Sequence, residues 1–99
     1  MNDGATSLLV ASEFGHRAVV RKLLARGANV NVADINSYTP LIRASNFGHV
    51  DVVSLLLAAG ANKHHVANTG ATAASLAGDY DDDEPAVKAA VLALLAAAP

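Results

Sequence analysis

The side chains that could do chemistry in this chain are four histidines and one cluster of acids. His16 and His49 each follow a glycine at a spacing of 33 residues, and recurrence with a fixed period is typical of a structural role. His64 and His65 are adjacent in a stretch that we expect to be extended, where neighbouring side chains point to opposite faces and do not readily share a metal ion. No spacing of serine, histidine and acid indicates a catalytic triad. We therefore predict no catalytic residue, no metal site and no cofactor, and we expect that the chain is not an enzyme.

The acids stand directly before Pro85 and comprise Asp79, Asp81, Asp82, Asp83 and Glu84. Their spacing imitates the opening of a calcium-binding loop, but Glu84 and Ala90 occupy the positions where such a loop needs glycine and glutamate. Carboxylates are favourable at the positive end of a helix, and we expect a helix over residues 86–97. The cluster is interpreted as a solvated helix start, and an acidic loop that docks a basic partner stays open as the alternative.

Composition narrows the class of protein. The chain has 99 residues, 53% of them hydrophobic, which indicates one small folded domain rather than a disordered segment. The absence of cysteine excludes disulfides and thiol chemistry. The longest apolar run, residues 89–98, is about half of a membrane span. With a net charge of −2 and no signal-like start, we expect a soluble intracellular protein of the cytoplasm or the nucleus, with no nucleic-acid partner and no membrane insertion.

The elements that position these residues come from an internal repeat with a period of 33. Ser-Glu-Phe-Gly-His at 12–16 returns as Ser-Asn-Phe-Gly-His at 45–49, and Gly-Ala-Asn at 27–29 returns at 60–62. The third unit is degenerate, because its Val-x-x-Leu-Leu pattern is shifted to an offset of 38. A five-residue insertion therefore falls within residues 79–85.

Each unit predicts a hairpin, a helix, a tight turn and a second helix. Thr6, Thr39 and Thr72 are expected to cap the first helix, and Pro40 is expected at its first position. Gly15 and Gly48 are expected to end it. In the second helix, an apolar stripe begins with a valine pair and ends with a leucine pair, and Gly27 and Gly60 follow it.

This pattern resembles the ankyrin-repeat family, strongly over residues 4–66 and weakly over 67–99. The matching residues in the second unit are Asp34, Thr39-Pro40-Leu41, Ala44, Gly48-His49, Val52-Val53, Leu55-Leu56-Leu57 and Gly60-Ala61. Two departures are Ile42, where the family has histidine, and Ser37, where it has glycine. The resemblance implies an all-α solenoid of three stacked hairpin and helix-turn-helix units in one domain, 1–99. The expected repeats are 1–33, 34–66 and 67–99, the last carrying the acidic insertion and serving as a C-terminal cap.

The resemblance also implies protein–protein recognition through hairpin tips and the concave face of the inner helices. The family's variable positions fall on Asn2, Asp3, Ala5, Glu13, Phe14, Ile35, Asn36, Tyr38, Asn46, Phe47, Asn68, Thr69, Asp79 and Tyr80, which are the predicted contacts with a protein partner. The alternative is a structural subunit or fragment of a larger assembly that packs through its solenoid ends.

Three of the aromatic residues recur at the period of the repeat: Phe14, Phe47 and Tyr80. They fit equally an exposed strip that contacts a partner and a ladder that packs between repeats. Arg43 interrupts an apolar series formed by Val10 and Leu76, and we expect it to pair with Glu13, with Asp79 or with a carboxylate of a partner.

The last helix is expected to bury one stripe against the preceding repeat: Val87, Val91, Leu94, Leu95 and Ala98. Leu92 falls outside this stripe, on a face of alanines. A terminal repeat normally has a polar outer face. We therefore expect this end to be covered, by further sequence, by a partner or by self-association.

Overall fold

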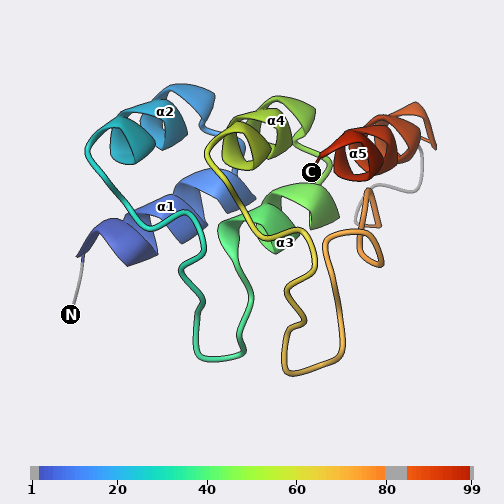
Figure 1. Ribbon diagram of the computed structural model, residues 1–99, viewed down its shortest axis with the longest axis horizontal. Helices are drawn as coiled ribbons and strands as arrows, with labels where there is room; N and C mark the ends of the chain where they lie inside the picture. The colour runs from blue at the N-terminus through green and yellow to red at the C-terminus, as the bar shows by residue number, and fades with distance from the viewer. Residues whose placement is uncertain (1–2, 80–84, 99) are drawn as a thin grey trace.

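The structure is a computed structural model that describes residues 3–79 and 85–98, with side chains from residue 7 onward. It contains the helices α1 (Asp3–Glu13), α2 (Arg17–Ala25), α3 (Pro40–Asn46), α4 (Val50–Ala58) and α5 (Pro85–Ala97). Figure 1 shows two rows of helices, α1 and α3 in one and α2, α4 and α5 in the other. The loops after α2 and α4 run past the first row and project beyond it. The described residues form helices, turns and loops without a strand, so the all-α solenoid is confirmed.

The first helices α1 and α3 begin differently, and only α3 has a proline after its threonine. Thr39 has extended backbone, its Oγ1 accepts the N–H of Ile42 at 3.3 Å, and Pro40 begins α3 as predicted. The prediction that Thr6 caps the first helix is wrong, because α1 begins at Asp3. Thr6 is followed by Ser7, and without a proline to exclude the α conformation the helix continues through it.

The expected first helix of the third unit is also absent, because residues 73–79 form consecutive turns. Thr72 does act as a cap, since its Oγ1 accepts the N–H of Ser75 at 3.1 Å. The N–H of Gly78, however, donates to the carbonyl oxygen of Ser45 at 2.8 Å, in another unit, and not to a carbonyl within its own segment. Contact with α3 therefore replaces the continuation of the helix.

Tight turns between paired helices hold the units close together. Gly15 and Gly48 have φ of +72° and +71°, which confirms the predicted helix ends. A Cβ on Gly15 would lie 2.6 Å from Nδ1 of His49, and one on Gly48 would lie 2.6 Å from Cγ1 of Val87. His49 and Val87 therefore pack in the same way, each against the glycine turn of the preceding unit. Val87 follows His49 by 38 residues, which is the shifted offset of the third unit.

The core runs through all three units, and α1 contacts α3, α2 contacts α4, and α4 contacts α5. Its largest buried side chains are Leu8, Leu41, Ile42, Leu56, Val20, Val52, Val53 and Val91. The predicted stripe of α5 is confirmed, because Val91 and Leu95 are buried and the other members are half-buried. One member of the predicted stripe in α2 differs: Val19 is 46% exposed, while its counterpart Val52 is 1% exposed.

The division into repeats 1–33, 34–66 and 67–99 stays a prediction. Its acidic insertion falls largely on residues 80–84, which lie outside the described part of the chain. None of the helices described is long and apolar enough to cross a membrane.

Candidate functional site

The predicted contact residues fall on the hairpin loops and at the ends of the inner helices. Ile35 is 92% exposed and Phe14 is 61% exposed. The others separate into an exposed group, Asn36, Asn68, Thr69 and Asp79, and a half-buried group, Glu13, Tyr38, Asn46 and Phe47. Asn2 and Tyr80 lie outside the described residues, and for Asp3 and Ala5 only the position in α1 is described.

The hairpin of the second unit is shaped by one carboxylate. Asp34 Oδ1 accepts the backbone N–H of Asn36 at 2.9 Å and that of Tyr38 at 3.0 Å, and the Ser37 N–H donates to the carbonyl oxygen of Asp34 at 2.9 Å. Ser37 has φ of 66°, a left-handed conformation that the family's glycine would adopt without strain. These bonds fix the loop that carries Ile35.

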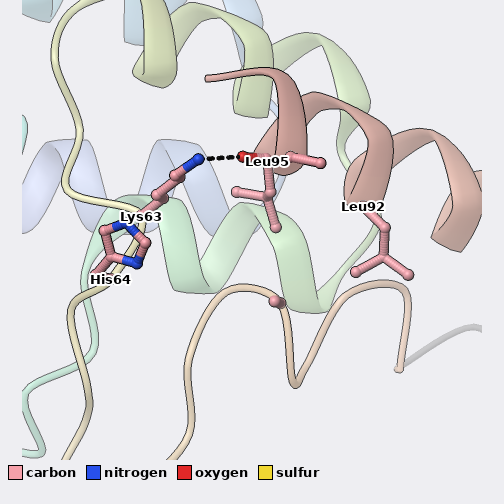
Figure 2. A pocket seen from close by; sticks show the side chains of 6 residues that line it. Lys63, His64, Leu92 and Leu95 are labelled. Carbon is pink, nitrogen blue, oxygen red and sulfur yellow. Dashed lines mark hydrogen bonds between the residues drawn. The ribbon is translucent and has the colours of Figure 1, made fainter. Parts of the chain in front are cut away.

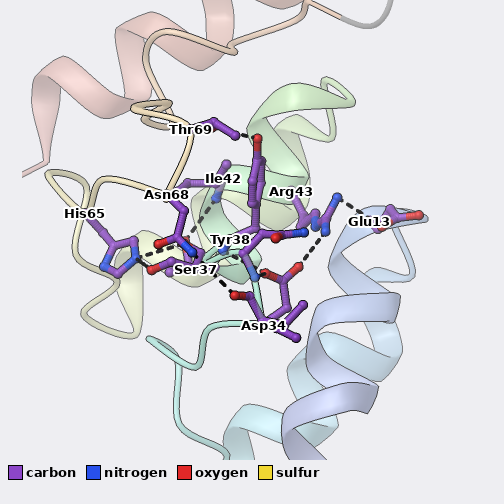
Figure 3. Close-up of polar contacts among 12 residues, drawn as sticks. Glu13, Asp34, Ser37, Tyr38, Ile42, Arg43, His65, Asn68 and Thr69 are labelled. Atoms are coloured by element: carbon purple, nitrogen blue, oxygen red, sulfur yellow. Dashed lines mark hydrogen bonds and ion pairs between the residues drawn. The ribbon is translucent and has the colours of Figure 1, made fainter.

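Backbone and side-chain groups of the next hairpin tie the two loops together (Figure 3). The backbone N–H of Asn68 donates to the carbonyl oxygen of Asn36 at 3.0 Å, and the Tyr38 hydroxyl lies 3.0 Å from Thr69 Oγ1. His65 Nε2 lies 2.9 Å from both the carbonyl oxygen and Oγ of Ser37. The two hairpin tips therefore form one linked platform.

Arg43 connects this platform to the first unit. Its guanidinium bonds Asp34 Oδ2 at 2.5 Å, lies 3.8 Å from Glu13 Oε1, and sits 4.7 Å from the centre of the Tyr38 ring. Pairing with Glu13 was predicted, whereas Asp34, the nearer partner, was not. Glu13 and Asp34 keep about a third or less of their side chains exposed, so the cluster is partly screened from water.

The carboxyl group of Asp34 is held in its charged form. Burial by itself would raise the pKa of Asp34, but the hydrogen bond from the Tyr38 N–H, the bond from Arg43 and the bond from the Asn36 N–H outweigh it and lower the pKa below its ordinary value. The charged carboxylate therefore serves as the centre of the hairpin structure.

The aromatic residues pair within their own units. The Phe14 ring centre lies 6.3 Å from that of His16, and the Phe47 ring centre lies 6.3 Å from that of His49. Since Tyr80 lies outside the described residues, both interpretations of the aromatic row stay open.

The histidines are distributed over different surroundings. His49 Nε2 donates to the carbonyl oxygen of Glu13 at 2.7 Å, which confirms a structural role between units. His65 supports the hairpin, and His64 is exposed. Residues 3–79 and 85–98 contain no group of three or more His, Asp or Glu side chains placed to hold a metal ion.

A largely apolar groove of about 410 Å³ lies between α5 and the loop after α4 (Figure 2). It is lined by Lys63, His64, Ala74, Leu92, Leu95 and Ala96. Lys63 Nζ donates to the carbonyl oxygens of Leu95 and Ala98, at 2.8 and 2.5 Å, and so satisfies the C-terminal end of α5. Leu92 is 37% exposed, as expected.

Sequence reasoning missed three connections in these sites: Arg43 with Asp34, Ser37 with His65, and Lys63 with α5. Arg43 was singled out because it interrupts an apolar series, but no periodicity relates position 43 to position 34. The contact between Ser37 and His65 had one signal in the sequence: Ser37 stands where the family has glycine. A serine with left-handed backbone at that position needs hydrogen bonds that stabilise it.

The comparisons with known proteins agree with this geometry. A family model of three ankyrin repeats matches residues 1–67. The crystal structure of the human ASB11 ankyrin repeat domain matches with a TM-score of 0.80 and 31% sequence identity, covering 90% of this chain and 38% of that one. The chain thus spans less than half of that solved relative's length, and comparison with curated protein sequences finds no match. This chain belongs to the ankyrin-repeat family.

Proposed function

We propose that the chain is a non-enzymatic intracellular module, of the cytoplasm or the nucleus, that binds a protein partner through its hairpin tips and the concave face of its inner helices. Ankyrin repeats are generally modules for protein–protein interaction. The partner-binding residues predicted from the sequence are proposed as this surface.

The observation that carries this proposal is the exposure of Ile35 on a linked platform. Ile35 is 92% exposed, although the loop around it is fixed by Asp34 and joined to the next hairpin through Asn36 and Asn68. Burying an isoleucine side chain contributes about 1.5–3 kcal/mol. Because the loop is already ordered, less conformational entropy is lost on binding.

The test is a selection of binding peptides from a displayed library, followed by affinity measurements on variants. We expect Ile35→Asp to weaken the selected binders by about tenfold or more, because a charged side chain would replace the apolar anchor. The matched control is Ser54→Lys, an exposed position on α4 away from the hairpins. Binders that lose affinity with Ser54→Lys and not with Ile35→Asp would contradict the proposal.

A second candidate is packing in a larger assembly through the end that contains α5. It is favoured by the exposure of Leu92 and by the apolar groove beside it. Sedimentation equilibrium tests the self-associating form: association that Leu92→Lys abolishes supports it, and a strict monomer at high micromolar concentration rejects it.

A further inference from the structure

The opposite end of the solenoid, formed by α1 and α2, presents an apolar surface. Val10 is 48% exposed and Val19 is 46% exposed. In the next unit, the counterpart of Val10 is Arg43, which reaches back to Glu13. The counterpart of Val19 is Val52, which is buried in α4, and α4 contacts α2. Positions 43 and 52 therefore face the preceding unit of the stack. Val10 and Val19 hold the same positions in the first unit, so they face its open end.

Cations border this apolar surface. Lys22 and Arg26 are exposed, and on a helix they lie on the same side as Val19. Among the side chains that the structure describes, those of residues 7–79 and 85–98, no carboxylate pairs with either of them. Arg17, by contrast, points the other way and pairs with Asp51 of α4 at 3.2 Å. The open end thus combines two exposed valines with two exposed cations.

The repeat itself does not require these cations. Their counterparts in the second unit are Leu55 and Ala59. Lys22 lies in the last turn of α2 and Arg26 is its C-cap residue, where cations are favourable, whereas α4 and α5 carry none in their last turns. Lys22 and Arg26 also stand four residues apart, where like charges repel. The helix dipole therefore favours each cation at the end of α2, whereas the repeat does not require them.

We propose that this open end binds a helical protein segment that carries carboxylates and apolar side chains. A helix fits because the counterpart surface of the second unit is covered by helices α1 and α2. The carboxylates complement Lys22 and Arg26. The exposed Val10 and Val19 favour a protein over a nucleic acid, whose phosphates would leave both valines unburied. This proposal does not depend on the hairpin platform.

The probe is a synthetic helical peptide with a leucine stripe flanked by glutamates four residues apart, measured by fluorescence anisotropy. We expect it to bind the chain and to weaken by about tenfold or more with Lys22→Glu and Arg26→Glu together. A matched peptide with lysines in place of the glutamates is expected to show the reverse preference. Lys22→Gln with Arg26→Gln, checked by circular dichroism, separates loss of charge from loss of fold.

The control variant is Lys88→Glu, an exposed cation on α5 at the other end of the solenoid, and it is expected to leave binding unchanged. Val19→Ser is expected to weaken the peptide several-fold without changing the fold, because it removes apolar contact. Three results would overturn the proposal: no binding at millimolar peptide, equal losses with Lys88→Glu and with the double variant, or binding of duplex DNA without binding of the peptide. Self-association that depends on Lys22 and Arg26 would also overturn it, by making a second copy the occupant.

Discussion

Substitution of Gly48 by alanine tests whether the third unit docks through Val87. The φ of +71° at Gly48 costs an alanine about 1–2 kcal/mol. The new Cβ would also lie 2.6 Å from Val87 Cγ1, and displacing a packed side chain costs roughly 1–3 kcal/mol more. We expect Gly48→Ala to lower the free energy of unfolding by about 2–5 kcal/mol, a large share of a typical small domain's stability.

The control is Gly60→Ala. Gly60 has φ of +93°, but nothing lies within 4 Å of the added Cβ. This variant is expected to lose only the backbone term of about 1–2 kcal/mol. The difference between the two variants therefore measures the contact between Gly48 and Val87.

Urea unfolding followed by circular dichroism gives the free energies, and hydrogen exchange of residues 85–98 locates the effect. Gly48→Ala is expected to speed exchange in α5 more than Gly60→Ala does. In a Val87→Ala background, the penalty of Gly48→Ala is expected to fall toward that of Gly60→Ala, because the opposing methyl groups are gone. Equal penalties for the two glycine variants, with no change in α5 exchange, would refute the docking geometry.

Ser45→Ala is expected to raise the free energy of unfolding by about 1–2 kcal/mol, because the buried hydroxyl has no hydrogen-bond partner among the described residues; a lower urea midpoint would contradict this. Thr39→Ala is expected to lower the free energy of unfolding by about 1 kcal/mol, because the hydrogen bond from the Ile42 N–H is lost. Thr39→Ser keeps a hydroxyl at this position and should retain most of that stability in the same assay. The lowered pKa of Asp34 stabilises the folded state at pH values above the pKa of the unfolded carboxyl, about 3.9, and this contribution is lost as the pH falls through the folded pKa. Asp34→Asn should therefore remove this loss of stability from unfolding curves measured over a series of acidic pH values.

The sequence alone predicted the repeat, the paired helices and most of their ends, because these features depend on local chemistry. Thr39 with Pro40 begins a helix, and Gly48 ends it, through contacts within a few residues. The apolar stripes were also correct in α4 and α5, and in α2 except at Val19. The contact surface could be predicted only as a set of positions, through resemblance to a family whose hairpins vary.

The tertiary structure decided what happens between units. Arg43 bonds Asp34 because folding brings the hairpin back over α3, and no helical or strand period links these two positions. Residues 73–79 form turns and not the expected helix, and the Gly78 N–H at their end donates to the carbonyl oxygen of Ser45 in another unit. Val19 is exposed and Val52 is buried, although the repeat places them identically. Their position in the repeat is the same, so the physical reason lies in the stack: burial in a solenoid requires a neighbouring unit, and only the assembled chain determines which positions have one.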